Sequence, residues 1–288
     1  MSEDVSQEVE ALFQQMFAAG ELEREDWYDF GGKLHQIGRP ALSRALELAH
    51  DPNPEVRERS AFVLGQLTDH EVSRQSKVQD GIPTLLSLLE HDPELEVRLM
   101  AANALSHLSS HEAIPLVIPL IDSPDSDARY AAAFALFCFG DESQWKLYPH
   151  LKPMVQEGLL RLTHDSDDKT RDYATCALHS SGHDTPEVHA RFWELLDDPD
   201  GNVCGEAARG LAKAGDKLLA PRLAQLLEEN YDLHYLYDAA EILGDPALLP
   251  AIKEAAEKWK ADCPDRYQIS TVESAIEVLE KSERLKLH

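Results

Sequence analysis

Two stretches of this sequence share one pattern of residues. Asp51–Leu67 reads DPNPEVRERSAFVLGQL, and Asp92–Leu108 reads DPELEVRLMAANALSHL. Four further segments follow the same frame: SPDSDARYAAAFALFCF from Ser123, DSDDKTRDYATCALHSSG from Asp165, DPDGNVCGEAARGLAKAG from Asp198 and NYDLHYLYDAAEILG from Asn230. The shared frame is D-P-x-x-x-V-R-x-x-A-A-x-A-L. Because one frame recurs along most of the chain, the sequence predicts a repeat architecture.

Each copy of the frame predicts a helix, and a second helix precedes it. The opening Asp-Pro supplies an N-cap acceptor and a proline where no N–H is needed. The V…A-A…A-L spacing returns apolar residues to one helical face, and its small residues let neighbouring helices approach closely. An amphipathic segment such as Gly81–His91 or His111–Asp122 stands before each frame. Each unit is therefore predicted to be a helix hairpin whose apolar face is buried by the next hairpin.

The remaining segments complete an all-helical architecture. Two polar insertions, Thr68–Asp80 and Asp141–Pro149, are expected to be loops. The flanks predict terminal helix pairs at Val5–Ala18 with Arg24–Ile37, and at Ala247–Ala261 with Arg266–Leu285. We predict an all-α fold, a right-handed α-solenoid of about eight antiparallel helix pairs. It is expected to be a single domain over 1–288, with a cap pair in 1–39, six consensus repeats in 40–244 and a cap pair in 245–288.

The charge of the chain restricts its partners. There are 27 Lys and Arg against 53 Asp and Glu, which gives a formal net charge of −26. A surface this acidic repels the phosphate groups of nucleic acids and of anionic membranes. We therefore expect neither a nucleic acid nor a membrane as partner. The charge suits a basic protein partner, and it equally suits plain solubility.

The cysteines and the first residues bear on location. The four cysteines include no CxxC pair, which indicates reduced thiols. The opening MSEDVSQEVE lacks the basic and apolar regions of a signal peptide. The apolar run Ala131–Phe139 is too short to cross a bilayer. We therefore expect a cytoplasmic protein.

The repeated frame resembles HEAT repeats, especially the short bacterial type first noted in phycobilin lyase subunits. The resemblance covers roughly Pro40 to Gly244. It implies that the arginine of the frame forms a structural ladder with an Asp of a neighbouring unit. The ladder arginines would be Arg57, Arg98, Arg129 and Arg171, and the candidate aspartates Asp51, Asp92, Asp122 and Asp165. The ladder lapses at Cys204 and Leu236, where the frame has no arginine.

The resemblance also implies that the second helix of each unit lines a concave groove. Counted from the valine of the frame, positions +2 and +6 face away from the core. The predicted partner-binding residues are Glu58, Phe62, Leu99, Asn103, Tyr130, Phe134, Asp172, Cys176, Arg209, Tyr237 and Glu241. Exposed aromatic groups among charges are typical of protein-binding hot spots. The alternative is that close packing buries these aromatic groups between repeats.

Metal and enzyme hypotheses find less in the sequence. One HEAT-repeat enzyme family, the deoxyhypusine hydroxylases, binds two irons through repeated His-Glu pairs. Here His70-Glu71 and His111-Glu112 do not occupy equivalent repeat positions. Cys176 and His179 have an i, i+3 spacing that suits zinc, but no further ligand is evident at a partnering spacing. No nucleotide-binding or hydrolase motif is present either. We therefore expect no catalytic residue, no metal and no cofactor.

The sequence thus favours a non-catalytic scaffold that binds a basic protein partner in its groove and is a monomer when free. One version is an acidic inhibitor or immunity protein that masks a cationic toxin. The alternative is a bilin lyase-like or metal-dependent HEAT-repeat enzyme or enzyme subunit.

Overall fold

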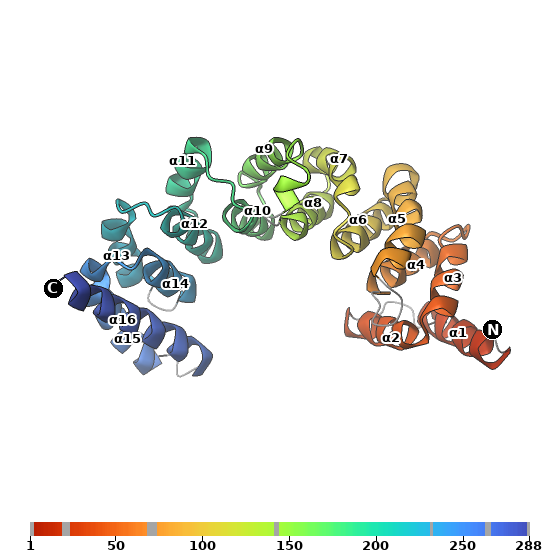
Figure 1. Cartoon of the computed structure of the whole chain (residues 1–288), viewed down its shortest axis with the longest axis horizontal. Coiled ribbons are helices and arrows are strands. Elements are labelled where there is room, and N and C mark those ends of the chain that lie inside the picture. Colours follow the sequence, from red (N-terminus) through yellow and green to blue (C-terminus); the bar gives the residue numbers. More distant parts are fainter. Residues whose placement is uncertain are drawn as a thin grey trace. The chain divides into compact units, whose positions relative to one another are not determined.

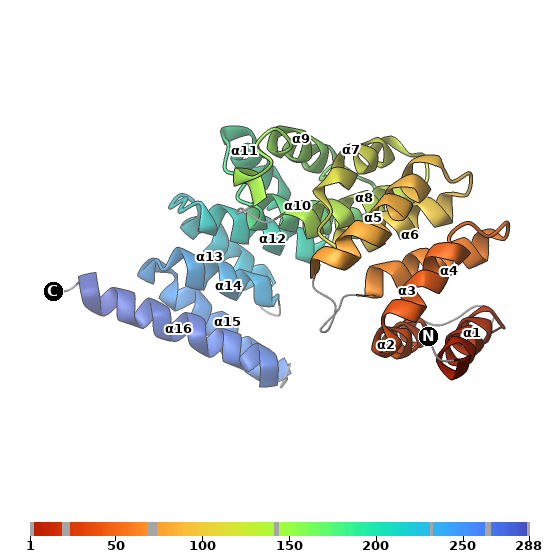
Figure 2. The same cartoon turned by 45° about the vertical axis from the view of Figure 1, so that its right-hand side comes forward.

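A computed structural model describes residues 3–18, 24–67, 74–140, 144–230, 233–262 and 266–286. The chain forms two compact units, Met1–Phe139 and Gly140–His288. All regular elements in the described residues are helices, which confirms the predicted all-α class. Within each unit the helices form antiparallel pairs stacked side by side, the arrangement of an α-solenoid (Figures 1 and 2).

The first unit contains three repeats behind a terminal pair. Its elements are α1 (Glu3–Ala18), α2 (Arg24–Ile37), α3 (Arg39–Leu48), α4 (Pro54–Gln66), α5 (Arg74–His91), α6 (Leu95–His107), η1 (His111–Ala113), α7 (Ile114–Val117), η2 (Ile118–Asp122) and α8 (Ser126–Phe139). The second helices of the repeats, α4, α6 and α8, lie side by side, and α2 continues this row against α4 (Figure 1). Side chains on one face of the row can therefore form a continuous surface.

The second unit repeats this plan. Its elements are η3 (Gln144–Lys146), α9 (Lys152–Leu162), α10 (Asp168–Ser180), α11 (Pro186–Leu195), α12 (Gly201–Lys213), α13 (Leu219–Glu229), α14 (His234–Leu243), η4 (Pro246–Leu248), α15 (Leu249–Asp262) and α16 (Arg266–Lys286). Here α10, α12, α14 and α16 form the row of neighbouring helices. The terminal pairs α1/α2 and α15/α16 lie where the sequence places them.

The Asp-Pro start of each repeat does not cap the helix as expected. The Oδ1 atom of Asp51 accepts the N–H of Asn53 at 2.8 Å, and Asn53 is the residue that caps α4. Likewise Asp198 accepts from Asp200 at 2.9 Å, and Asp200 caps α12. The Asp of the frame therefore forms an Asx turn, and the helix begins about one turn later.

Two segments differ from their predicted structure. The segment His111–Asp122 is not one helix but η1, α7 and η2. Pro115 and Pro119 explain the break, because a proline inside a helix removes an N–H donor and clashes with the preceding turn. The insertion Thr68–Asp80 is not wholly a loop, since α5 already begins at Arg74. Residues 68–73, like 141–143 of the other insertion, lie outside the described residues.

Small residues set the distance between the stacked second helices. The second position of the A-A pair is buried in every repeat and holds alanine or, once, threonine: Ala61, Ala102, Ala133, Thr175, Ala208 and Ala240. The two helices approach closely at Gly65 of α4, where an added Cβ would lie 2.7 Å from Cβ and 2.8 Å from Cα of Ala104 in α6. Since Cα belongs to the backbone, the neighbouring helix itself would have to move. The repeat spacing therefore requires glycine at this position.

We predict opposite effects for two glycine substitutions. Gly65→Ala should destabilise the protein by about 1–3 kcal/mol, because it overpacks the α4–α6 contact. Gly32→Ala in α2, where an added Cβ meets nothing within 4 Å, should stabilise it by up to about 1 kcal/mol through helix propensity. Urea unfolding of both variants measures the difference. A Gly65→Ala variant as stable as Gly32→Ala would contradict the close packing.

The repeated arginines close the turn of their own repeat. The Nη1 atom of Arg57 donates to the carbonyl oxygens of Asp51 and Pro52 at 2.9 and 3.1 Å. Arg98, Arg129 and Arg171 make the same pair of main-chain contacts, at the carbonyls six and five residues earlier. This closure of the turn explains why the arginine recurs at one position of the frame.

Arg57 and Arg171 also connect one repeat to the next. Arg57 donates Nε and Nη2 to the carboxylate of Asp92 at 2.7 and 2.8 Å. Arg171 does the same to Asp198 at 2.9 and 2.8 Å. Burial works to raise the pKa of Asp92, but the hydrogen bonds from Arg57 and from the N–H of Glu94, together with the charges of Arg57 and Arg98, bring it below its ordinary value. These bidentate ion pairs are nearly buried, so they join consecutive Asx turns more firmly than exposed pairs could.

The ion pair can be measured by comparing two arginine variants. Arg57→Ala removes the main-chain contacts and the Asp92 pair, whereas Arg98→Ala removes only main-chain contacts among those that the described residues show. Arg57→Ala should therefore be more destabilising than Arg98→Ala, by about 2 kcal/mol. Urea unfolding at neutral pH gives both values. Equal losses would mean that the bond to Asp92 adds nothing to the turn closure.

Candidate binding groove and polar cluster

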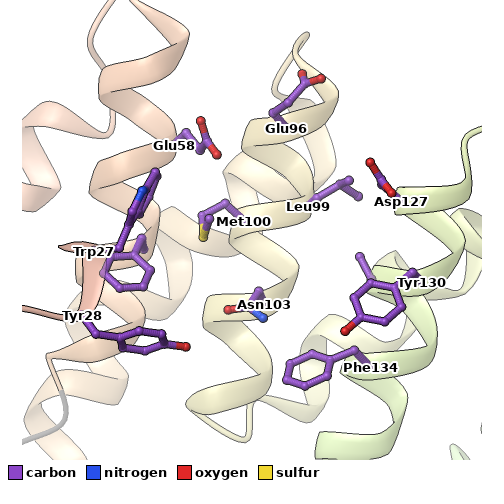
Figure 3. A pocket seen from close by; sticks show the side chains of 12 residues that line it. Trp27, Tyr28, Glu58, Glu96, Leu99, Met100, Asn103, Asp127, Tyr130 and Phe134 are labelled. Carbon is purple, nitrogen blue, oxygen red and sulfur yellow. The ribbon is translucent and has the colours of Figure 1, made fainter. Parts of the chain in front are cut away.

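The first unit contains a cavity of about 420 Å³ on the row formed by α2, α4, α6 and α8 (Figure 3). Its lining residues are Trp27, Tyr28, Glu58, Phe62, Glu96, Leu99, Met100, Asn103, Asp127, Tyr130, Ala131 and Phe134. We call this cavity the aromatic groove. Five of its twelve lining side chains are aromatic and three are carboxylates, and none is a lysine or an arginine.

Aromatic rings form two opposite walls of the groove. Trp27 and Tyr28 of α2 contact Phe62 of α4 edge to face, with ring centroids 5.1 and 5.6 Å apart. Across the groove, Tyr130 and Phe134 stand one turn apart on α8 (Figure 3). Both are half-buried. Leu99, Met100 and Asn103 of α6 form the floor between the walls, so the groove between the aromatic rings is largely apolar.

Three carboxylates gather at one end of the groove. Glu58, Glu96 and Asp127 come from α4, α6 and α8 and lie at the same end in Figure 3. Burial raises the pKa of Glu58, and the charge of Glu96 adds to the effect, although Arg59 opposes it. In the described part of the chain, no cation lies within ion-pair distance of these three carboxylates. This end of the groove is therefore suited to a positive charge.

All six groove residues predicted in the first three repeats line this one cavity. They are Glu58, Phe62, Leu99, Asn103, Tyr130 and Phe134. Phe62 is only 6% exposed, so it is a wall of the groove rather than an exposed anchor. The sequence analysis did not identify Trp27 and Tyr28, which were assigned to a terminal pair. Two adjacent aromatic residues in the polar segment REDWYDFGGK were the available signal.

The predicted groove residues of the second unit differ in how far they are buried. Asp172, Cys176, Arg209 and Glu241 are half-buried. Tyr237 was predicted to be exposed, and this is wrong: its exposure is 0% and its ring stacks on Trp259 of α15 at 6.0 Å. The terminal helices α15 and α16 cover that side of the last repeat, which explains the burial.

The side chains of α10 and α12 form a second feature, which we call the polar cluster. Its members are Cys176 and His179 of α10 and Glu206 of α12, whose ligand atoms all lie within 4.8 Å of one another. The Nε2 atom of His179 is 2.5 Å from Oε2 of Glu206. On the other ring nitrogen, Nδ1, the Nζ atom of Lys213 lies at 3.0 Å. Arg209 donates to the remaining oxygen of Glu206 at 3.0 Å.

The charges within the polar cluster follow from these contacts. Burial lowers the pKa of His179, so its ring is neutral at pH 7. Since Lys213 has only hydrogens to donate, Nδ1 of the ring accepts and Nε2 carries the proton donated to Glu206. Burial works to raise the pKa of Glu206, but the hydrogen bond from His179 and the charge of Arg209 bring it below its ordinary value. Burial, with Glu206, raises the pKa of Cys176 to about 12.

Asp172, one turn before Cys176, is the group most perturbed toward neutral pH. Burial, with the charges of Glu206 and Asp200, raises its pKa to about 6. Its Oδ1 atom is buried and has no hydrogen-bond partner among the described residues. An ionised Asp172 at pH 7 is therefore a source of instability in the second unit.

Removing this charge should stabilise the protein above pH 6. Because the folded-state pKa is raised, the folded protein keeps a proton that the unfolded chain releases, and stability falls from about pH 4 to about pH 6. Asp172→Asn should raise the urea midpoint at pH 7 and leave it unchanged at pH 4. Glu157→Gln, at an exposed carboxylate of α9 that does not act on Asp172, is the control and should not raise the midpoint at either pH. Equal midpoints for wild type and Asp172→Asn at pH 7 would contradict the assignment.

Of the two His-Glu pairs, His111-Glu112 lies in the described residues. His111 is buried, and its Nε2 atom lies 3.2 Å from the carbonyl oxygen of Phe139. Glu112 points to solvent. The other pair, His70-Glu71, lies outside the described residues.

Among the helices that the structure describes, none combines the length and the apolar character needed to cross a membrane.

Comparison with known proteins agrees with the stacked helix pairs. Residues 36–136 match the family model of HEAT repeats. This part of the chain consists of HEAT repeats. Protein YibA of Escherichia coli strain K12 is 26% identical to this chain over 253 residues, which cover 85% of this chain and 82% of YibA.

Two solved structures share the fold. The crystal structure of YibA matches with a TM-score of 0.67 and 22% identity, over 97% of each chain. A designed armadillo repeat protein matches with a TM-score of 0.50 and 17% identity, over 83% of this chain and 99% of that one. At these identities the likeness extends to the α-solenoid fold and not to an activity.

Proposed function

We propose that this protein is a non-catalytic scaffold that binds a basic segment of a protein partner in the aromatic groove. The observation that carries the proposal is the groove itself, in which aromatic walls lead to a cluster of three carboxylates that form no ion pair in the described residues. A lysine or arginine side chain has the matching form, with an apolar stem and a charged end.

The physical basis of binding is twofold. The stem of a lysine or arginine would pack between the walls, where Tyr130 and Phe134 face Trp27. A cation over an aromatic ring gains about 0.5–2 kcal/mol, the larger value when water is excluded. The charged end would then reach Glu58, Glu96 or Asp127. Binding a cation also relieves the cost of ionised Glu58, whose pKa is raised by burial in the free protein.

The net charge of −26 supports a basic partner at longer range. A strongly acidic surface accelerates the encounter with a basic protein and repels nucleic acids and anionic membranes. The more specific form of the proposal is an acidic inhibitor or immunity protein that covers a cationic enzyme. It would act in the cytoplasm, where thiols stay reduced, and as a monomer when free.

The alternative of a HEAT-repeat enzyme has one specific observation in its favour. The polar cluster brings a cysteine, a histidine and a glutamate together, as a metal-dependent enzyme or enzyme subunit would require. The polar cluster does not favour the bilin lyase-like form of this alternative. A binding scaffold is therefore the function that the groove supports best.

The groove can be tested with an oligo-arginine peptide as probe, in isothermal titration calorimetry with the whole protein. Tyr130→Ala should weaken binding by at least about fivefold, or about 1 kcal/mol, because it removes one aromatic wall. Glu96→Gln together with Asp127→Asn should also weaken it, since both carboxylates lie at the charged end of the groove. Higher ionic strength should lower the affinity.

The matched control is Tyr148→Ala, another half-buried tyrosine, in the second unit. It should leave the affinity unchanged, and an oligo-glutamate peptide should not bind. Equal losses in Tyr130→Ala and Tyr148→Ala would place binding outside the groove. An affinity that does not change with salt would remove the electrostatic part of the proposal.

A further inference from the structure

The polar cluster contains three different metal-ligand types in one place. Cys176 and His179 are three residues apart on α10, so both side chains lie on one helical face. Glu206 comes from the adjacent helix α12 and is buried against them. Thiolate, imidazole and carboxylate are the three side chains that bind zinc in proteins. The spacing in the sequence indicated Cys176 and His179, and the packing of consecutive repeats adds Glu206.

We propose that Cys176, His179 and Glu206 form a binding site for a zinc ion, with the fourth position left for water or for a ligand from outside the chain. All three ligand atoms lie within 4.8 Å of one another. Tetrahedral zinc with bonds of about 2.0–2.3 Å places its ligands roughly 3.3–3.8 Å apart. Small rotations of side chains would bring the three atoms to these separations, with Nε2 of His179 and Oε2 of Glu206 moving apart from 2.5 Å and without movement of either helix.

The charge balance of the cluster suits a divalent cation. Thiolate and carboxylate together carry two negative charges, which neutralise zinc. Arg209 binds one oxygen of Glu206 at 3.0 Å and leaves Oε2, the oxygen beside His179, for the metal. Arg209 thus acts as a positioning residue that orients the carboxylate of Glu206. Its positive charge at the same time lowers the affinity of the cluster for zinc.

Unpartnered polar atoms next to the cluster are a second, independent indication of a ligand. His183, which follows His179 by about one turn, is 2% exposed, and neither of its ring nitrogens has a hydrogen-bond partner among the described residues. His179, His183 and Lys213 line the same cavity, whose volume is about 230 Å³. A bound water needs roughly 30 Å³, so the cavity has room for water molecules that could complete the zinc shell and satisfy His183.

Metal binding requires one proton to leave the protein. The thiol of Cys176 loses its proton as the sulfur–zinc bond forms. The Nε2 proton of His179 must move to Nδ1, which frees Nε2 for zinc and leaves the ring neutral. Lys213 now donates to Nδ1 and has to turn away to solvent. One proton is therefore released for each zinc ion bound.

Cobalt(II) tests the site without any assumption about activity. We expect the metal-free protein to bind one Co²⁺ per chain at this site, with a thiolate-to-cobalt charge-transfer band, and to lose the band when one equivalent of Zn²⁺ is added. Cys176→Ser should abolish the band, and Glu206→Gln should weaken binding by about tenfold or more. Cys138→Ser, a half-buried cysteine of the first unit, is the matched control and should keep the full band.

Lys213→Gln separates a metal site from a merely structural cluster. A glutamine carbonyl can accept the Nδ1–H of a metal-bound His179, as the second-shell partners of zinc ligands do, and the substitution also removes a cation. We expect tighter zinc binding by about tenfold in competition with a chromophoric chelator. A band that persists in Cys176→Ser, no band in the wild type, or unchanged affinity in Lys213→Gln would each overturn the proposal. Circular dichroism of each variant shows whether it is folded.

Discussion

The close contact between successive second helices is the constraint on which the rest of the structure depends. At Gly65 the backbone of α4 lies against Ala104 of α6 with no room for even a methyl group. Buried small residues occupy the equivalent side of every repeat. Side chains of any size must then project from the remaining positions of these helices. The same constraint therefore creates both the tight spine and the row of larger side chains beside it.

The two units use this row for different chemistry. In the first unit the row presents Tyr130 and Phe134 opposite Trp27, with carboxylates at one end. In the second unit the corresponding positions hold Cys176 and Arg209, and Glu206 is buried between them and His179. Repeated helix pairs with different side chains thus supply an aromatic groove in one unit and a polar cluster in the other. The backbone plan needs no change for either.

Much of the fold follows from the sequence because each repeat carries its own local signals. The A-A pair marks the buried side of each second helix, and the terminal pairs were predicted within a few residues of their helices. The start of each repeat was interpreted wrongly, since Asp51 forms an Asx turn and Asn53 caps the helix. The His111–Asp122 segment was predicted as one helix because its apolar spacing outweighed its two prolines.

The sites were less predictable, because they depend on residues that periodicity does not connect. The groove positions on α4, α6 and α8 follow from counting along one frame, whereas Trp27 enters from a helix outside that frame. Tyr237 fits the frame and is nevertheless buried, since the covering helices belong to the terminal pair. Glu206 became a neighbour of His179 only through the packing of α10 on α12. Sequence spacing gives the face of a helix, and only the neighbouring helix decides what that face meets.

The ring of Trp27 has a practical consequence. It is the one tryptophan of the first unit, and it borders the aromatic groove, whereas Trp145, Trp193 and Trp259 belong to the second. A chain in which those three are phenylalanine would emit indole fluorescence from the groove wall alone. Because indole emission depends on contact with water, a partner that displaced water from the groove would shift the emission wavelength of Trp27.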